Sequence, residues 1–128
     1  MNLKTILFLP VYLFSIIIYS QSYSYNENKE FIVSGKVTNS ENSEPLEYAT
    51  ITILDLKDNN VVTGGLSDEN GNFKISTKKG IYNVLIEYMS FKNKTLENIN
   101  VYNDLSLGEV QLELNYESLG EVEIIADE

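Results

Sequence analysis

Residues 81–88 read IYNVLIEY, with an apolar side chain at every second position. The regular apolar set is Tyr82, Val84, Ile86 and Tyr88, and the positions between them mix apolar with polar residues. Successive side chains of a β-strand point to opposite faces of the sheet, so a period of two is typical of a strand with one buried face. The stretch therefore predicts a strand that turns one side into a hydrophobic core.

Six further runs favour strands for the same reason. They are Ile32–Val37, Ala49–Leu56, Val61–Thr63, Phe73–Ser76, Thr95–Tyr102 and Glu109–Leu114. Turn-forming residues separate the runs; in DENGN (residues 68–72), Gly71 stands where a left-handed backbone conformation is needed. No run has a helical period, so we expect an all-β domain, a small antiparallel seven-stranded β-sandwich.

The N-terminal residues 1–20 predict an export signal. Lys4 supplies a positive charge, an apolar run follows from Ile6 to Tyr19, and Ser20 is a small residue before an expected cleavage site at Gln21. A membrane anchor is the alternative, but the run is about fourteen residues, shorter than the roughly 20 that span a bilayer. No cysteine follows it, so a lipid anchor is not expected. We expect residues 1–20 to be removed and residues 21–30 to form a flexible leader.

The composition excludes several classes of function. Nine basic residues stand against 19 acidic ones, a net charge of −10, and Lys4 is removed with the export signal. Such a surface repels nucleic-acid phosphates and has no basic patch for anionic lipid. The chain has no histidine, hence neither the commonest general base nor the commonest zinc ligand, and no cysteine for a disulfide. We therefore predict no catalytic residue, metal or cofactor.

The stretch SGKVTNSENSEPLEYATITIL (residues 34–54) resembles the opening of the carboxypeptidase regulatory-like domain, which has a transthyretin-like (prealbumin-like, Ig-like) fold. The family pattern runs G-x-V, P-L-x-x-A, D-x-x-G-x-F and G-x-Y. The matching positions are Gly35, Val37, Pro45, Leu46, Ala49, Asp68, Gly71, Phe73, Gly80 and Tyr82. The resemblance covers about residues 31–115 and implies structural roles for these residues.

The segment SLGEVEIIA (residues 118–126) resembles the link that follows this domain in TonB-dependent outer-membrane receptors of Gram-negative bacteria. The matching positions are Leu119, Glu121, Val122, Ile124 and Ile125. The resemblance implies that residues 116–128 are a linker or plug-lead segment, similar to a TonB box, which pairs with a TonB-type transducer by strand addition. On periodicity alone, the segment could instead be a last strand of the sandwich.

These resemblances imply a non-enzymatic N-terminal accessory domain of a transport receptor, located in the periplasm at the outer membrane and acting by protein–protein contact. A receptor also needs a plug and a β-barrel, whereas the sequence ends at Glu128. We therefore expect either the N-terminal piece of such a receptor or a free-standing secreted or surface module that binds protein or glycan. An enzyme appendage is a further alternative, one that would be inactive by itself.

Two local stretches have both a chemical and a structural interpretation. The oxygen-rich stretch Asp68–Asn72 suggests calcium, but the distal bidentate glutamate of a calcium loop is missing, so we expect a β-turn. The pair Gly64-Gly65 lacks the lysine and Ser/Thr of a phosphate loop, so it predicts a bulge or a close backbone approach.

Overall fold

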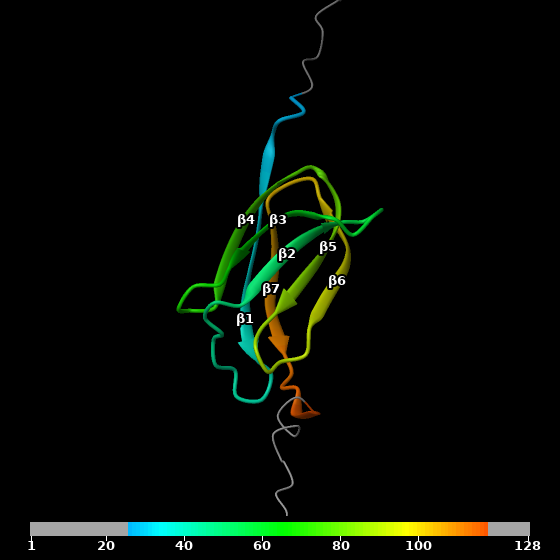
Figure 1. The fold of residues 1–128 in the computed structure, drawn as a ribbon. Helices are drawn as coiled ribbons and strands as arrows, with labels where there is room; N and C mark the ends of the chain where they lie inside the picture. The colour runs from blue at the N-terminus through cyan, green and yellow to red at the C-terminus, as the bar shows by residue number, and fades with distance from the viewer. Residues whose placement is uncertain (1–25, 118–128) are drawn as a thin grey trace, which may run out of the picture.

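The computed structural model describes residues 26–117. The strands are β1 (Glu30–Asn39), β2 (Thr50–Asp55), β3 (Val61–Leu66), β4 (Asn72–Lys78), β5 (Gly80–Glu87), β6 (Lys94–Val101) and β7 (Leu105–Leu112). They form a three-stranded sheet in the order β4-β1-β7 and a four-stranded sheet in the order β3-β2-β5-β6 (Figure 1). The predicted seven-stranded β-sandwich is confirmed. The expected export signal and the receptor-like residues 118–126 lie outside the described residues.

The core lies between the two sheets and contains the alternate residues predicted from the sequence. Ile51 and Ile53 of β2 and Ile86 of β5 are fully buried, as are Val33 and Val37 of β1 in the other sheet. The removal of these apolar side chains from water is the main force that holds the sheets together. Partly buried aromatic and aliphatic side chains pack around this cluster: Phe31, Tyr88, Phe91, Leu96, Ile99, Leu105 and Leu107.

Strand β7 departs most from the expected bounds, because it begins at Leu105 and not at Glu109. Its register against β1 shifts next to Gly108, which has a φ of 70°. A bulge of this kind inserts one residue and reverses which side the following residues face. The half-buried Leu107 and the buried Val110 are therefore three positions apart, and a search for strict alternation misses the first half of the strand.

The sandwich is not antiparallel throughout. Strand β1 pairs with β4 in antiparallel fashion, but it pairs with β7 in parallel. The first and last strands are not joined by a hairpin, so no short connection forces them to run in opposite directions. The two ends of the described chain lie at opposite poles of the sandwich (Figure 1).

Among residues 26–117, no helix is both long and apolar enough to cross a membrane.

One core position holds a polar group without a hydrogen-bond partner. Thr77 is only 3% exposed, and within the described part of the chain its hydroxyl makes no hydrogen bond. A buried hydroxyl without a partner costs about 1–3 kcal/mol. We expect Thr77→Val, which keeps the shape and removes the hydroxyl, to raise the free energy of unfolding by about 1 kcal/mol in urea titrations. Thr95→Val on the exposed side of β6 is the control, and an equal gain there would contradict the explanation.

Candidate protein-interaction site

Several of the family-pattern residues meet at the turn between β3 and β4. The carbonyl of Gly71 accepts a hydrogen bond from Val37 N (2.8 Å), and the carbonyl of Val37 accepts one from Leu46 N (3.0 Å). Gly71 has a φ of 77°, and a Cβ there would lie 2.5 Å from the Val37 oxygen. The turn, β1 and the loop after β1 are thus joined by their backbones, which makes these residues structural.

Two further glycines of the pattern lie under aromatic rings. A Cβ at Gly35 would lie 2.6 Å from the ring of Phe73, which is 3% exposed. A Cβ at Gly80 would lie 2.9 Å from the hydroxyl of Tyr82, which donates a hydrogen bond to the carbonyl of Lys78. Each glycine lets an aromatic side chain close over the backbone.

The remaining residues of the pattern lie in the loop before β2 and at the turn. Pro45 forms an isolated bridge with Thr38, Leu46 is 7% exposed, and Ala49 is fully buried. One carboxylate oxygen of Asp68 accepts hydrogen bonds from the backbone N–H groups of Asn70 and Asn72, each 2.9 Å long. These bonds confirm the turn. Within the described residues, no three His, Cys, Asp or Glu side chains gather as a metal site would require.

Sequence reasoning missed Ser67, which connects the turn to the loop before β2. The side chain is 2% exposed, and its hydroxyl donates a hydrogen bond to the Leu46 carbonyl (2.5 Å) and accepts one from Ala49 N (2.8 Å). Its only signal in the sequence is a small polar residue directly before the Asp68 turn.

The four edge strands differ in charge. Edge β4 carries Lys74 and Lys78, and edge β6 carries Lys94 and Glu97. Edge β7 carries Glu109 and the Gly108 bulge, and Lys94 Nζ donates a hydrogen bond across to its Gln111 carbonyl. Charges of this kind oppose pairing with other chains.

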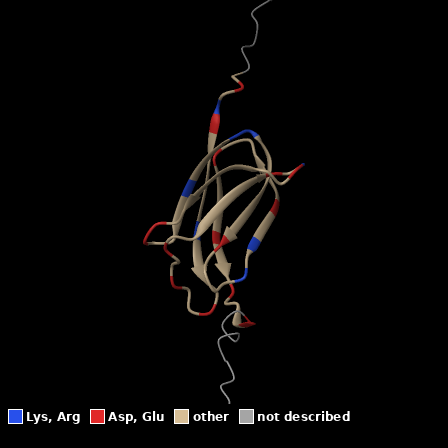
Figure 2. Ribbon diagram, viewed as in Figure 1, with Lys and Arg blue, Asp and Glu red and all other residues tan. Residues whose placement is uncertain are grey.

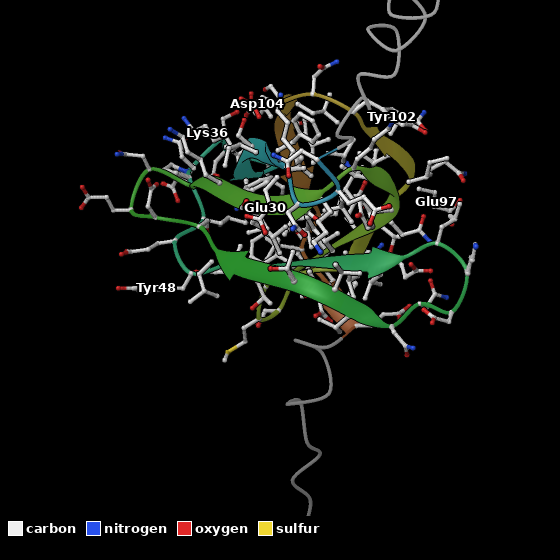
Figure 3. All side chains as sticks on the ribbon, turned by 90° about the horizontal axis from the view of Figure 1, so that it is seen from above. Glu30, Lys36, Tyr48, Glu97, Tyr102 and Asp104 are labelled. Carbon is white, nitrogen blue, oxygen red and sulfur yellow. The ribbon has the colours of Figure 1, made fainter. Side chains whose placement is uncertain are left out.

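Edge β3 has no charged residue in its sequence VVTGGL. Three of its apolar side chains are exposed: Val61 by 70%, Val62 by 46% and Leu66 by 59%. Acidic residues are concentrated in the loops and at the ends of the sandwich (Figure 2), and in the view from above β3 passes β2 on the outside of the molecule (Figure 3). An uncharged apolar edge is a template for another strand. We therefore take β3 as the candidate protein-interaction site.

The Gly64-Gly65 pair inside β3 is a close backbone approach, as predicted. A Cβ at Gly64 would lie 2.7 Å from the Ile51 carbonyl oxygen, and a Cβ at Gly65 would lie 3.3 Å from the side chain of Ile75 in the facing sheet. The register shift in this hairpin falls beside the pair, at Val62. The strand runs three residues beyond the predicted Thr63, because glycines have low strand propensity and hide the continuation.

The outer face of the four-stranded sheet continues the apolar character of β3. Strands β2 and β5 turn the following residues outward: Thr50, Thr52, Leu54, Ile81, Asn83, Leu85 and Glu87. Of these, only Glu87 is charged. The outer face of the other sheet carries Lys36 on β1 in addition to the lysines of β4. The two faces of the sandwich are therefore unequal, and the face beside β3 is better suited to a dry contact.

One exposed aromatic residue lies at the end of this face. Tyr48 is 68% exposed, has a φ of 63°, and donates its backbone N–H to the Ser67 carbonyl (Figure 3). Positive φ is uncommon for a bulky residue, and strained residues of this kind concentrate at functional sites. Tyrosine is also enriched among the residues that dominate binding at protein interfaces.

Two open hollows elsewhere on the described surface are lined in part by charged residues. One of about 230 Å³ between β6 and β7 contains the ion pair Lys92–Glu113, 3.8 Å long. Another, of about 400 Å³, lies over the three-stranded sheet between Lys74 and Asp104. Beyond β7, Tyr116 donates a hydrogen bond to the Glu41 carboxylate, which raises the pKa of the tyrosine above its usual value. None of these features groups a nucleophile with a base.

Comparison with known proteins agrees with the geometry. The family model described as carboxypeptidase regulatory-like domain matches residues 32–114. No curated protein matches the chain.

Solved structures share the sandwich at low sequence identity. A chain of a type II cohesin–X-dockerin complex from Acetivibrio cellulolyticus is 22% identical, with a TM-score of 0.50, over 62% of this chain and 52% of its own. The TIE protein of Bacillus anthracis is 17% identical (TM-score 0.51; 66% and 17% coverage), and a 9R-lipoxygenase from Cyanothece is 14% identical (TM-score 0.52; 72% and 17%). The chain thus spans about half of the first structure and less of the others. The likeness is one of fold.

Proposed function

The chain belongs to the carboxypeptidase regulatory-like domain family, and from this we propose that it is a non-enzymatic accessory domain of a TonB-dependent outer-membrane receptor. In this proposal the domain is exported to the periplasm and acts there by protein–protein contact. It is N-terminal to the receptor's plug and helps to position the receptor or to couple it to its energy transducer.

The observation that carries the proposal is the order of two segments. The family match ends at residue 114, and the receptor-like stretch SLGEVEIIA begins at Ser118. The described chain enters the sandwich at one pole and leaves it at the other, an arrangement that suits a spacer between a leader and a following segment (Figure 1).

The proposal expects residues 119–125 to bind a transducer as an added strand. The mature protein, residues 21–128, should bind the periplasmic domain of a TonB-type transducer in isothermal titration calorimetry. Val122→Pro removes a backbone donor from the middle of the segment and should weaken binding by about tenfold, because strand addition depends on backbone hydrogen bonds. Ser118→Pro, which lies outside residues 119–125, is the matched control and should bind normally. Absence of binding by the unaltered protein would reject the receptor role.

The uncharged edge β3 favours a second candidate, a free-standing secreted or surface module that binds protein or glycan. The two candidates differ in what the gene encodes after codon 128. A plug and barrel in any reading frame support the receptor, and their absence supports the free-standing module.

A further inference from the structure

We propose that edge β3 pairs with β3 of a second copy of this chain, in antiparallel fashion about a twofold axis at Gly64. The contact would join two four-stranded sheets into one continuous sheet. The proposed contact does not use residues 118–128. A test of the dimer is therefore independent of a test of transducer binding.

The first support is that the backbone groups of β3 have the required directions. Ser67 donates its N–H to the Ala49 carbonyl and accepts a hydrogen bond from Tyr48 N, so its backbone groups face the β2 side. In an antiparallel ladder, alternate residues direct both groups to the same side. Leu66 and Gly64 therefore direct theirs away from β2, where no strand of the described residues pairs with them.

The second support is that one twofold register matches both backbone and side chains. With Gly64 opposite Gly64 of the second copy, Leu66 lies opposite Val62, and Thr63 lies opposite Gly65. Leu66 shares the outward face with its β2 partner Thr50, and Val62, at the register shift of this hairpin, is 46% exposed. Each exposed leucine then covers an exposed valine. A register two residues further along would place Val62 opposite Asp68, where an acidic group would face an apolar one.

The charges at the ends of β3 make the proposed association sensitive to salt. Asp68 and Glu69 of one copy would lie beside the Lys57–Asn60 turn of the other, which contains one lysine and one aspartate. Each end of the contact would therefore bring together three acidic residues and one lysine, which adds to the repulsion between the two acidic chains. This repulsion is screened by salt, so association should strengthen as salt is added.

Cysteine cross-linking tests the register directly, because the natural chain has no cysteine. Val62→Cys and Leu66→Cys proteins are prepared separately, mixed, and oxidised in a glutathione buffer. Opposed residues in an antiparallel pair have Cα atoms about 5.5 Å apart, within the range that a disulfide accepts. The mixture should form heterodimeric disulfides about tenfold faster than either protein alone, since identical positions lie about 13 Å apart along the strands. Ile81→Cys mixed with Leu66→Cys is the control.

Sedimentation equilibrium tests the association itself. The natural protein should show a monomer–dimer equilibrium up to about 100 µM, a range that weak dimers populate. Val62→Lys should be monomeric, whereas Ile81→Lys, an equal charge change at a residue of β5 that is 38% exposed, should still dimerise. A monomeric natural protein, a Val62→Lys dimer, or equal cross-linking in the control mixture would each overturn the proposal. Circular dichroism confirms that each variant is folded.

Discussion

Replacing Gly71 by alanine is expected to lower the free energy of unfolding by about 3–5 kcal/mol, measured by urea denaturation followed by circular dichroism. The left-handed conformation at a φ of 77° costs an L-residue about 1–2 kcal/mol. The new Cβ would also lie 2.5 Å from the Val37 carbonyl oxygen. That contact must be relieved by moving β1 or the turn, which weakens the backbone hydrogen bonds from Val37 and Leu46.

Gly108→Ala separates the two causes of this loss. Gly108 has a φ of 70°, but a Cβ there would meet no atom within 4 Å. Only the conformational cost applies, so we expect a loss of about 1 kcal/mol. If the two variants lost the same free energy of unfolding, the close approach at Gly71 would have no energetic importance. The meeting of family-pattern residues at the turn between β3 and β4 would then need another explanation.

Much of the fold could be predicted, because the alternation of apolar and polar side chains along a strand indicates directly which of them are buried. The set Tyr82, Val84 and Ile86 is buried as the sequence predicts, and Gly71 has the left-handed conformation that its turn predicts. The first half of β7 could not be found, because the bulge at Gly108 reverses the alternation. The parallel pairing of β1 with β7 depends on which strands become neighbours, and alternation carries no information on that.

The candidate site was harder to predict than the fold. The family-pattern residues could be named in advance, as residues with structural roles, and they lie in turns and packing contacts. Edge β3 could not be identified, because a strand is an edge only by its position in the sheet order. The sequence does contain one usable signal: between Asp58 and Asp68 no residue is charged, although the chain as a whole is strongly acidic. An uncharged strand in such a chain lacks the charges that usually protect an edge strand.

Ser67→Ala is expected to cost about 2–4 kcal/mol, the second large effect. The hydroxyl serves two buried backbone groups, the Leu46 carbonyl that it donates to and the Ala49 N–H that it accepts from. Alanine satisfies neither, and each unsatisfied buried group costs about 1–3 kcal/mol. Urea denaturation measures the total, and hydrogen exchange measures the local effect, since the Ala49 amide should exchange faster than the amides of the core.

Ser76→Ala is the matched control, because its hydroxyl also makes a short hydrogen bond, 2.6 Å to the Glu30 carboxylate, but on the exposed side of β4. Water replaces that bond at once, so we expect a change within about 0.5 kcal/mol. Similar small losses at both positions would contradict the role of Ser67. They would mean that the Leu46–Ala49 loop relaxes to satisfy its own backbone, and that the turn is held by the Gly71–Val37 pairing alone. A large loss at Ser67 only would show that its two buried hydrogen bonds stabilise the contact between the end of β3 and the loop before β2.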